Sequence, residues 1–140
     1  LAYRYFYVKT TYEGKELQRP LIANNRAFAN LAYAISGWKF DYTVNLNGPK
    51  RIPSTAGNPA SYRQALRSPS YWLMNAQISK TVFEKHPVDI YIGGENLTNY
   101  FQKDVILAAD QPFSSWFDAS LVWGPVSGRL VYLGFRYKIK

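Results

Sequence analysis

The chain has 140 residues, a formal net charge of +8 and no cysteine. This length fits one modest domain or a piece of a larger one, and the lack of cysteine excludes disulfide scaffolds and thiolate metal sites. The 12 tyrosines, eight phenylalanines and four tryptophans would suit a nucleic-acid surface, but the cations are spread along the chain without a compact basic run, so we expect no nucleic-acid partner.

Six segments alternate apolar and polar residues or are rich in β-forming residues. They predict strands at approximately Ala2–Tyr12, Arg26–Ile35, Trp38–Asn47, Tyr71–Phe83, Val88–Tyr100 and Arg129–Lys140. A short helix fits only Pro59–Arg67, because proline is suited to the first helical position. The chain opens on a strand pattern, without a signal peptide or an apolar run of the ~20 residues that span a membrane as a helix. We therefore expect it to be the C-terminal part of a longer protein.

The predicted strands have one apolar and one polar face. In the third, the apolar face holds Trp38, Phe40, Tyr42, Val44 and Leu46, and the polar face holds Lys39, Asp41, Thr43, Asn45 and Asn47. The fourth and last segments repeat the pattern, with Lys80 as the exception on an apolar face. Lys80 lies near a strand end, where its long side chain can reach a polar boundary. A soluble sandwich strand with one wet face gives the same pattern.

The connections between strands alternate in length. Ser36-Gly37 and Glu84-Lys85-His86-Pro87 are short, whereas Glu13–Asn25, Gly48–Ser70 and Phe101–Gly128 are long. Short turns at one end and long loops at the other are typical of outer-membrane barrels, and segments of ~10 residues match a tilted strand that crosses a bilayer. The predicted fold class is therefore all-β, an antiparallel up-and-down transmembrane β-barrel.

In such a barrel, aromatic residues near strand ends form interfacial girdles. The candidates are Tyr33, Trp38, Tyr71 and Trp72. The polar faces would line the lumen, where they contact water or an internal plug; the candidates are Lys39, Asp41, Asn45, Asn75, Gln77, Arg136 and Lys138. In a soluble sheet the same aromatics would be ordinary core residues.

Several motifs, in the right order, resemble the C-terminal end of TonB-dependent outer-membrane receptors. They are SPSYWLMNAQISKTV, GGENLTNYFQ, FDASLVWGPVSGR and the final amphipathic strand, and the upstream RPLIANNRAFANLAYAI and GWKFDYTVNLNG also fit the family's barrel strands. The resemblance covers nearly the whole chain.

The resemblance implies that residues 1–140 form the last six strands of a barrel of about 22, with the plug domain, the earlier strands and the TonB-engaging peptide upstream. It implies active import of a scarce nutrient across the bacterial outer membrane with TonB-supplied energy. A ferric siderophore is the expected cargo, with haem, cobalamin or a glycan as alternatives, and some members carry a surface lipoprotein as a partner. Many such barrels end on an aromatic residue, whereas this chain ends on Lys140.

No pattern for catalysis or metal binding is present. The sequence lacks a nucleophile elbow, a phosphate-binding loop and a zinc pattern, and its one histidine, His86, lies in a predicted turn. We therefore expect no enzyme activity, no cofactor and no metal site. Asn96-Leu97-Thr98 is a glycosylation sequon, which carries no weight in a bacterial barrel.

The long loops hold the candidate substrate contacts. Tyr62, Arg63 and Arg67 suit an anionic ligand, because guanidinium groups pair with carboxylates through two hydrogen bonds. Phe113, Trp116 and Phe117 offer rings for stacking on catechols or sugars. The same residues could instead pack the loops against one another.

The pair Gly93-Gly94 interrupts the alternation of the fifth predicted strand. Leu97 would otherwise turn inward, so we predict a β-bulge at the glycines. No helix pattern follows them, which argues against a phosphate-binding loop.

Two other readings remain. A soluble β-barrel or sandwich could bind a small ligand or single-stranded nucleic acid, provided that its apolar face closes on another apolar face of the same chain. Alternatively, the chain could belong to a membrane barrel that acts as a passive pore, without energised transport.

Overall fold

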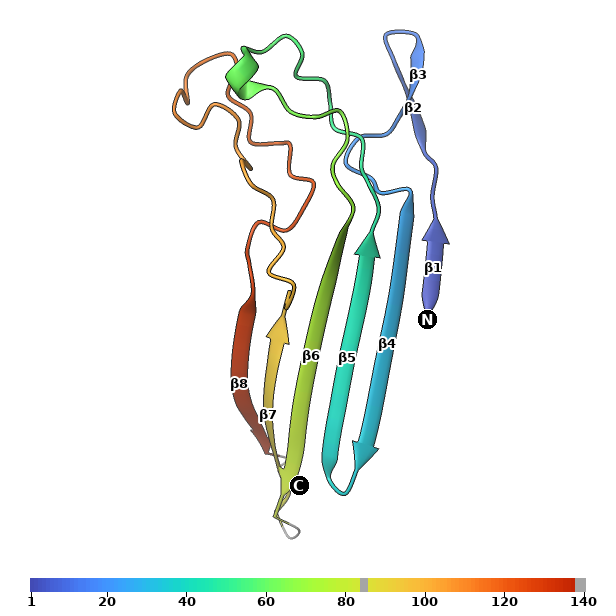
Figure 1. Cartoon of the computed structure of the whole chain (residues 1–140), viewed down its shortest axis with the longest axis vertical. Coiled ribbons are helices and arrows are strands. Elements are labelled where there is room, and N and C mark those ends of the chain that lie inside the picture. Colours follow the sequence, from blue (N-terminus) through green and yellow to red (C-terminus); the bar gives the residue numbers. More distant parts are fainter. Residues whose placement is uncertain (84–85, 138–140) are drawn as a thin grey trace.

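The computed structural model describes residues 1–83 and 86–137, and these form an all-β, antiparallel structure (Figure 1). The strands are β1 (Ala2–Tyr5), β2 (Lys9–Tyr12), β3 (Lys15–Gln18), β4 (Asn25–Ile35), β5 (Trp38–Asn47), β6 (Tyr71–Val82), β7 (Val88–Glu95) and β8 (Leu130–Tyr137). Six of them form one sheet in the order β1-β4-β5-β6-β7-β8, and β2 and β3 form a separate hairpin. The prediction of an all-β antiparallel fold is confirmed.

The predicted first strand, Ala2–Tyr12, is wrong in extent. It divides into β1, which pairs with β4, and β2, which leaves the sheet and pairs with β3. The cause is a tight turn at Glu13 and Gly14, whose φ angles are 47° and 77°. Positive φ at both central residues is the geometry of the two-residue hairpin turn, so β2 and β3 pair with each other.

The same turn geometry joins β4 to β5. Ser36 and Gly37 have φ angles of 46° and 77°, and the two strands pair without interruption from Ile35 opposite Trp38 to Arg26 opposite Asn47. All three long connections lie at the other end of the sheet from this turn (Figure 1). Part of the second predicted short turn, residues 84 and 85, lies outside the described residues.

The register assembles one continuous apolar face. Residues directly opposite in an antiparallel pair point to the same side of a sheet. Phe40 lies opposite Tyr33 and Ile78, Ile78 lies opposite Ile92, and Ile92 lies opposite Leu133. Lys80 is the one charged residue on this face within the six described strands. Its Nζ donates to the Ser36 carbonyl oxygen at 2.7 Å and lies 5.1 Å from the centroid of the Trp38 ring.

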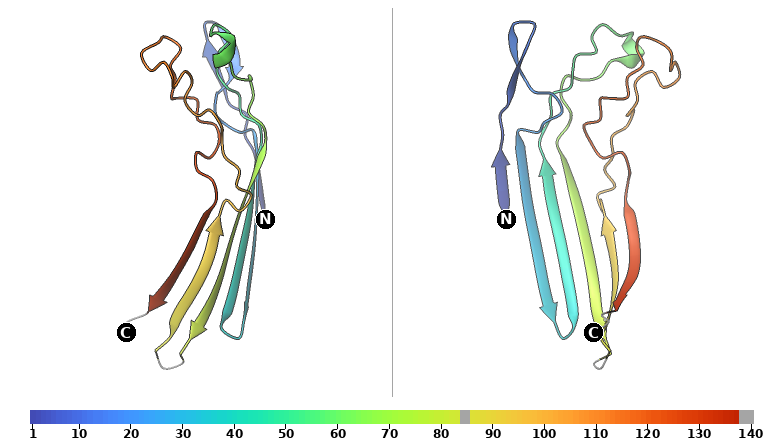
Figure 2. Two further views of the ribbon diagram at one scale, coloured as in Figure 1. Left: turned by 60° about the vertical axis from the view of Figure 1, so that its left-hand side comes forward. Right: turned by 180° about the vertical axis from the view of Figure 1, so that it is seen from behind.

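The sheet is curved but open (Figure 2). Within the described part of the chain, β1 pairs only with β4 and β8 pairs only with β7, so no closed barrel is present there and the transmembrane barrel stays a prediction. Among these residues no helix has the length and apolar composition needed to cross a membrane.

The short helix considered possible at Pro59–Arg67 does not extend over that range. Only a single 3-10 turn forms, at Ala60–Tyr62, with Pro59 before it as N-cap. Arg63 is already extended, with φ −91° and ψ 138°, and no side chain caps the turn. A helix of one or two turns forms too few hydrogen bonds to offset the entropic cost of nucleation. The rest of the segment therefore stays irregular.

The bulge predicted at Gly93-Gly94 is also wrong. Both glycines keep the register with β6 and with β8. A Cβ on Gly93 would overlap the Tyr132 ring, and one on Gly94 would lie 2.7 Å from Leu97 Cδ2. The glycines therefore make room for two side chains. The change of parity comes from Asn96, whose φ of 49° ends β7 at Glu95 rather than at Tyr100 and turns Leu97 back over Gly94.

We expect Gly93→Ala to lower the free energy of unfolding by about 1–3 kcal/mol, the usual cost of overpacking. The new methyl group would overlap the ring of Tyr132. In a Tyr132→Ala background the same substitution should cost almost nothing, because the overlapping ring is gone. Chemical denaturation followed by tryptophan fluorescence measures both values. Gly57→Ala is the control, since no atom lies within 4 Å of the position of its Cβ; an equal loss there would contradict the explanation.

Candidate functional site

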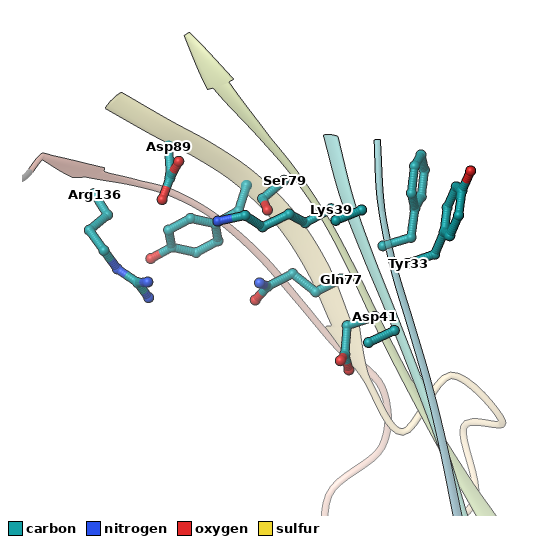
Figure 3. Close-up of a pocket in the computed structure, with 11 residues that line it drawn as sticks. Tyr33, Lys39, Asp41, Gln77, Ser79, Asp89 and Arg136 are labelled. Carbon is teal, nitrogen blue, oxygen red and sulfur yellow. The ribbon is translucent and has the colours of Figure 1, made fainter. Parts of the chain in front are cut away.

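The polar face of the sheet is hollowed near the Ser36–Gly37 turn, and Figure 3 shows the side chains that line the hollow. Its volume is about 390 Å³. It brings together four of the predicted lumen-facing residues, Lys39, Asp41, Gln77 and Arg136, with Ser79, Asp89 and Tyr91 beside them. They come from four neighbouring strands, β5 to β8.

Several polar groups in this hollow already have partners. Asn30 Nδ2 donates to both carboxylate oxygens of Asp41 at 3.2 Å, and Thr81 Oγ1 donates to Asp89 Oδ1 at 2.6 Å. Tyr132 Oη donates to Gln77 Oε1 at 3.1 Å. The surface is therefore of mixed charge and internally bonded, and it suits contact with water or with another polar surface.

Two further predicted lumen residues, Asn45 and Asn75, lie away from this hollow. Asn45 is on the same face, in a second hollow of about 410 Å³ that Arg4 and Arg26 also line. Asn75 Oδ1 accepts a hydrogen bond from the backbone N–H of Asn96 at 2.9 Å, so it holds a loop in place. Lys138 lies outside the described residues.

Three of the four predicted interfacial aromatics share the apolar face. Tyr33 and Trp38 flank the tight turn and each stack on Phe40, with ring centroids 6.5 and 6.2 Å apart. Trp72 lies near the other end of the same face, opposite Leu46. Tyr71 differs, because it points to the opposite face and is only 6% exposed, so its ring is not available to an interfacial girdle.

Tyr71 instead belongs to a cluster where the sheet meets the long loops. Its ring stacks on Tyr100 at 4.8 Å between centroids, and Lys50 Nζ lies 3.4 Å from its hydroxyl group and also donates to the Trp123 carbonyl oxygen. Burial lowers the pKa of Lys50, and the positive charge of Arg26 lowers it further. The cluster ties residues 48–70 and 96–129 to the end of β6.

The ENLTNY stretch is a hydrogen-bonded corner. Asn96 is buried, and its Nδ2 donates to the carbonyl oxygens of Tyr100 and Ser127 at 2.7 and 3.2 Å. Its Oδ1 accepts from the Tyr100 N–H at 3.1 Å and from Thr98 Oγ1 at 3.0 Å. Every polar atom of this amide is in use, so the sequon residues have a structural role.

Gln102 fixes the last long loop in the same way. It is 2% exposed, and its Nε2 donates to the Leu121 carbonyl oxygen at 2.9 Å. Its Oε1 accepts from the N–H groups of Trp123 and Gly124 at 2.7 and 3.0 Å. One side chain thus satisfies three backbone groups of a segment that has no strand partner.

The two groups of predicted substrate contacts are separate in the structure. Arg63 and Arg67 line a cleft of about 250 Å³ between the loops. Tyr62 lies beside it and donates a hydrogen bond to Asp110 Oδ2 at 2.8 Å, which raises the pKa of the tyrosine. None of the predicted stacking residues, Phe113, Trp116 and Phe117, lines the cleft.

Three residues near this cleft have no signal in the sequence. Gln64 and Lys103 line the cleft, and Lys50 is buried beside it in the aromatic cluster. Nothing in the local pattern separates them from solvated loop residues, because their neighbours come from a loop about 40 or more positions away in the chain.

His86 is exposed in the described structure. No group of three or more histidine, aspartate or glutamate side chains there has the spacing to hold a metal ion.

Comparisons with protein-family models, with curated proteins and with solved structures found no match to this chain.

We expect Asn96→Asp to destabilise the protein by about 1–3 kcal/mol, because it removes two donors from the carbonyl oxygens of Tyr100 and Ser127 and places a carboxylate oxygen against these part-buried acceptors. Asn99→Asp is the matched control: Asn99 also has positive φ, and its Oδ1 only accepts, from the Arg129 N–H at 2.9 Å. The denaturation midpoint should fall for the first variant and stay nearly unchanged for the second. Equal effects would mean that charge alone is responsible.

Proposed function

We propose that the chain is the C-terminal part of the β-barrel of a TonB-dependent outer-membrane receptor, which imports a scarce nutrient with TonB-supplied energy. A ferric siderophore is the favoured cargo. The proposal rests on one observation above all: the apolar face of the six-stranded sheet is continuous and uncovered. Leu31, Leu133 and Phe135 on that face are 71%, 74% and 76% exposed.

An uncovered apolar face of this extent needs a covering. Soluble monomers rarely expose contiguous apolar patches above a few hundred Å², and burying apolar surface contributes roughly 25 cal/mol per Å². Lipid tails would cover all strands at once without requiring a matching protein surface. In this arrangement the opposite face, with Lys39, Asp41 and Arg136, would line the lumen.

The dimensions of the sheet support the same placement. β4, β5 and β6 have 11, 10 and 12 residues, and a tilted membrane strand needs about 9–11. The long connections share one end and the Ser36–Gly37 turn lies at the other, as in barrels with external loops and periplasmic turns. Lys80 directs its amine to the carbonyl oxygen of Ser36 at that turn, as a lysine does at a membrane boundary.

The open edges support a larger barrel. β1 and β8 each have one side without a strand partner among the described residues, and unpaired backbone groups within a bilayer are too costly to persist. Further strands of the same barrel would pair with both edges and close the wall.

The soluble alternative requires the apolar face to close on another apolar face of the same chain. The small buried apolar cluster of the loops, Ile52, Leu107 and Leu121, lies elsewhere, and the sheet face is exposed along its length. This observation favours the membrane proposal over a soluble ligand-binding module.

We expect adjacent residues of β5 to report opposite environments in the full-length protein in bilayers. Val44 points to the apolar face and Asn45 to the polar one, and these 140 residues contain no competing cysteine. A fluorophore on Val44→Cys should be quenched by brominated lipid, and one on Asn45→Cys by aqueous iodide. Iodide quenching at both positions, or a protein that stays monomeric in buffer without detergent, would overturn the placement.

We expect cells that lack the full gene to lose uptake of their ferric siderophore, and loss of TonB to have the same effect, because the proposed import is energised. Uptake of radioactive iron measures both, with the restored gene as control. Uptake that continues without TonB would indicate a passive pore instead.

A further inference from the structure

The cleft between the two long loops is a built site. Arg63 and Arg67 come from residues 48–70, and Lys103 and Asp104 come from residues 96–129. The loops lie side by side at one end of the sheet (Figure 1) and are joined across the cleft by Gln64 Nε2, which donates to the Asp104 carbonyl oxygen at 3.3 Å. The walls are therefore held together before any ligand arrives.

The charge of the cleft is positive. Three cationic side chains against one carboxylate leave a formal charge of +2, since 3 − 1 = 2. None of the three cations forms an ion pair with Asp104 or with another carboxylate of the described residues. Arg63 uses Nε on the Asn58 carbonyl oxygen at 2.8 Å, which leaves its terminal nitrogens for a ligand. A guanidinium fork and an ammonium together suit a carboxylate.

The floor of the cleft is apolar and small. Ile52 and Leu107 are buried there, and Trp123 packs against them. The volume of about 250 Å³ is below the roughly 300–1,000 Å³ of pockets for drug-sized ligands. It fits one ring-sized group with a carbon skeleton, and it is too small for a complete metal–chelator complex.

An unpaired acceptor lies in the wall. Gln64 Oε1 is buried without a hydrogen-bond partner in the described structure, and such a group lacks the stabilisation that a donor would give. The terminal torsion of glutamine is soft, so the amide can turn its oxygen toward a donor in the cleft, with the ligand contact replacing the 3.3 Å hydrogen bond to Asp104. A ligand hydroxyl group is a donor of suitable size.

Taken with the positive charge and the small apolar floor, this acceptor identifies the ligand chemistry. We propose that the cleft binds a hydroxy-carboxylate of the size of one sugar acid, with the carboxylate on Arg67 and Lys103 and a hydroxyl group on Gln64. The role of the cleft in uptake rests on the proposed function. The hydroxy-carboxylate would be a free molecule or one unit of a larger nutrient ligand. Binding itself requires only the loops.

The experiment is calorimetric titration of the purified full-length protein in detergent with glucuronate as the probe. Saturable binding of one glucuronate per chain is expected. Glucose lacks the charge and acetate lacks the hydroxyl groups, so both should bind at least about tenfold more weakly. Higher salt should weaken the binding of glucuronate, because exposed charge pairs are screened.

Variants test the assigned contacts. Arg67→Gln and Lys103→Gln should each weaken glucuronate binding about tenfold. Arg67→Lys keeps the charge but loses the two-pronged guanidinium group, so its affinity for glucuronate should lie between those of Arg67→Gln and the unaltered protein. Gln64→Leu should weaken glucuronate and leave acetate unchanged. Arg19→Gln is the control, because Arg19 is exposed outside the cleft. Unchanged melting temperatures would show that the variants fold.

The absence of saturable glucuronate binding would overturn the proposal, as would equal effects of Arg19→Gln and Arg67→Gln. These results are separate from the membrane test. If glucuronate does not bind but the fluorophore on Val44→Cys is quenched by brominated lipid, the transport proposal stands and the cleft proposal fails. If glucuronate binds to a protein that is soluble without detergent, the cleft proposal stands and the transport proposal fails.

Discussion

The register of one antiparallel sheet is the constraint on which the rest of this structure depends. Because opposite residues in adjacent strands point to the same side, the alternation in each strand adds up across all six strands. The result is a face of Leu, Ile, Phe, Tyr and Trp residues that the described chain leaves uncovered and a hollowed polar face behind it. A slip of one residue in any pair would mix the two surfaces. The tight turn at Ser36–Gly37 fixes one register directly.

The long loops are organised by polar side chains rather than by a large core. Their buried apolar cluster has only three members, Ile52, Leu107 and Leu121. The apolar residues of the sheet lie on its uncovered face and add nothing to this cluster. The loop backbone therefore finds its hydrogen bonds on Asn96 and Gln102, each of which satisfies several groups. Such an arrangement leaves space between the loops, and the cationic cleft is part of that space.

The glycines of β7 and β8 show how the polar face is packed. Gly93 lies opposite Tyr132 and Gly134 lies opposite Tyr91, and each tyrosine ring occupies the position where a Cβ would otherwise be. The two rings meet at 6.3 Å between centroids. Their planes are inclined at 65°, an edge-to-face arrangement, and Tyr91 lines the hollow together with Gln77 and Arg136.

The sequence by itself determined the fold class, the positions of β4, β5 and β6 to within one residue and the division of their side chains between two faces, because a period of two is a local property of a strand. It did not predict the break between β1 and β2, the straight run of β7 through Gly93-Gly94 or the burial of Tyr71 and Lys50. The break between β1 and β2 goes with the local turn at Glu13 and Gly14. Only the tertiary structure decided the others, since each depends on a partner distant in the chain: Tyr132 for Gly93, Tyr100 for Tyr71 and Trp123 for Lys50. The cleft follows the same rule, because Arg67 and Lys103 come from different loops and meet only when the sheet brings those loops together.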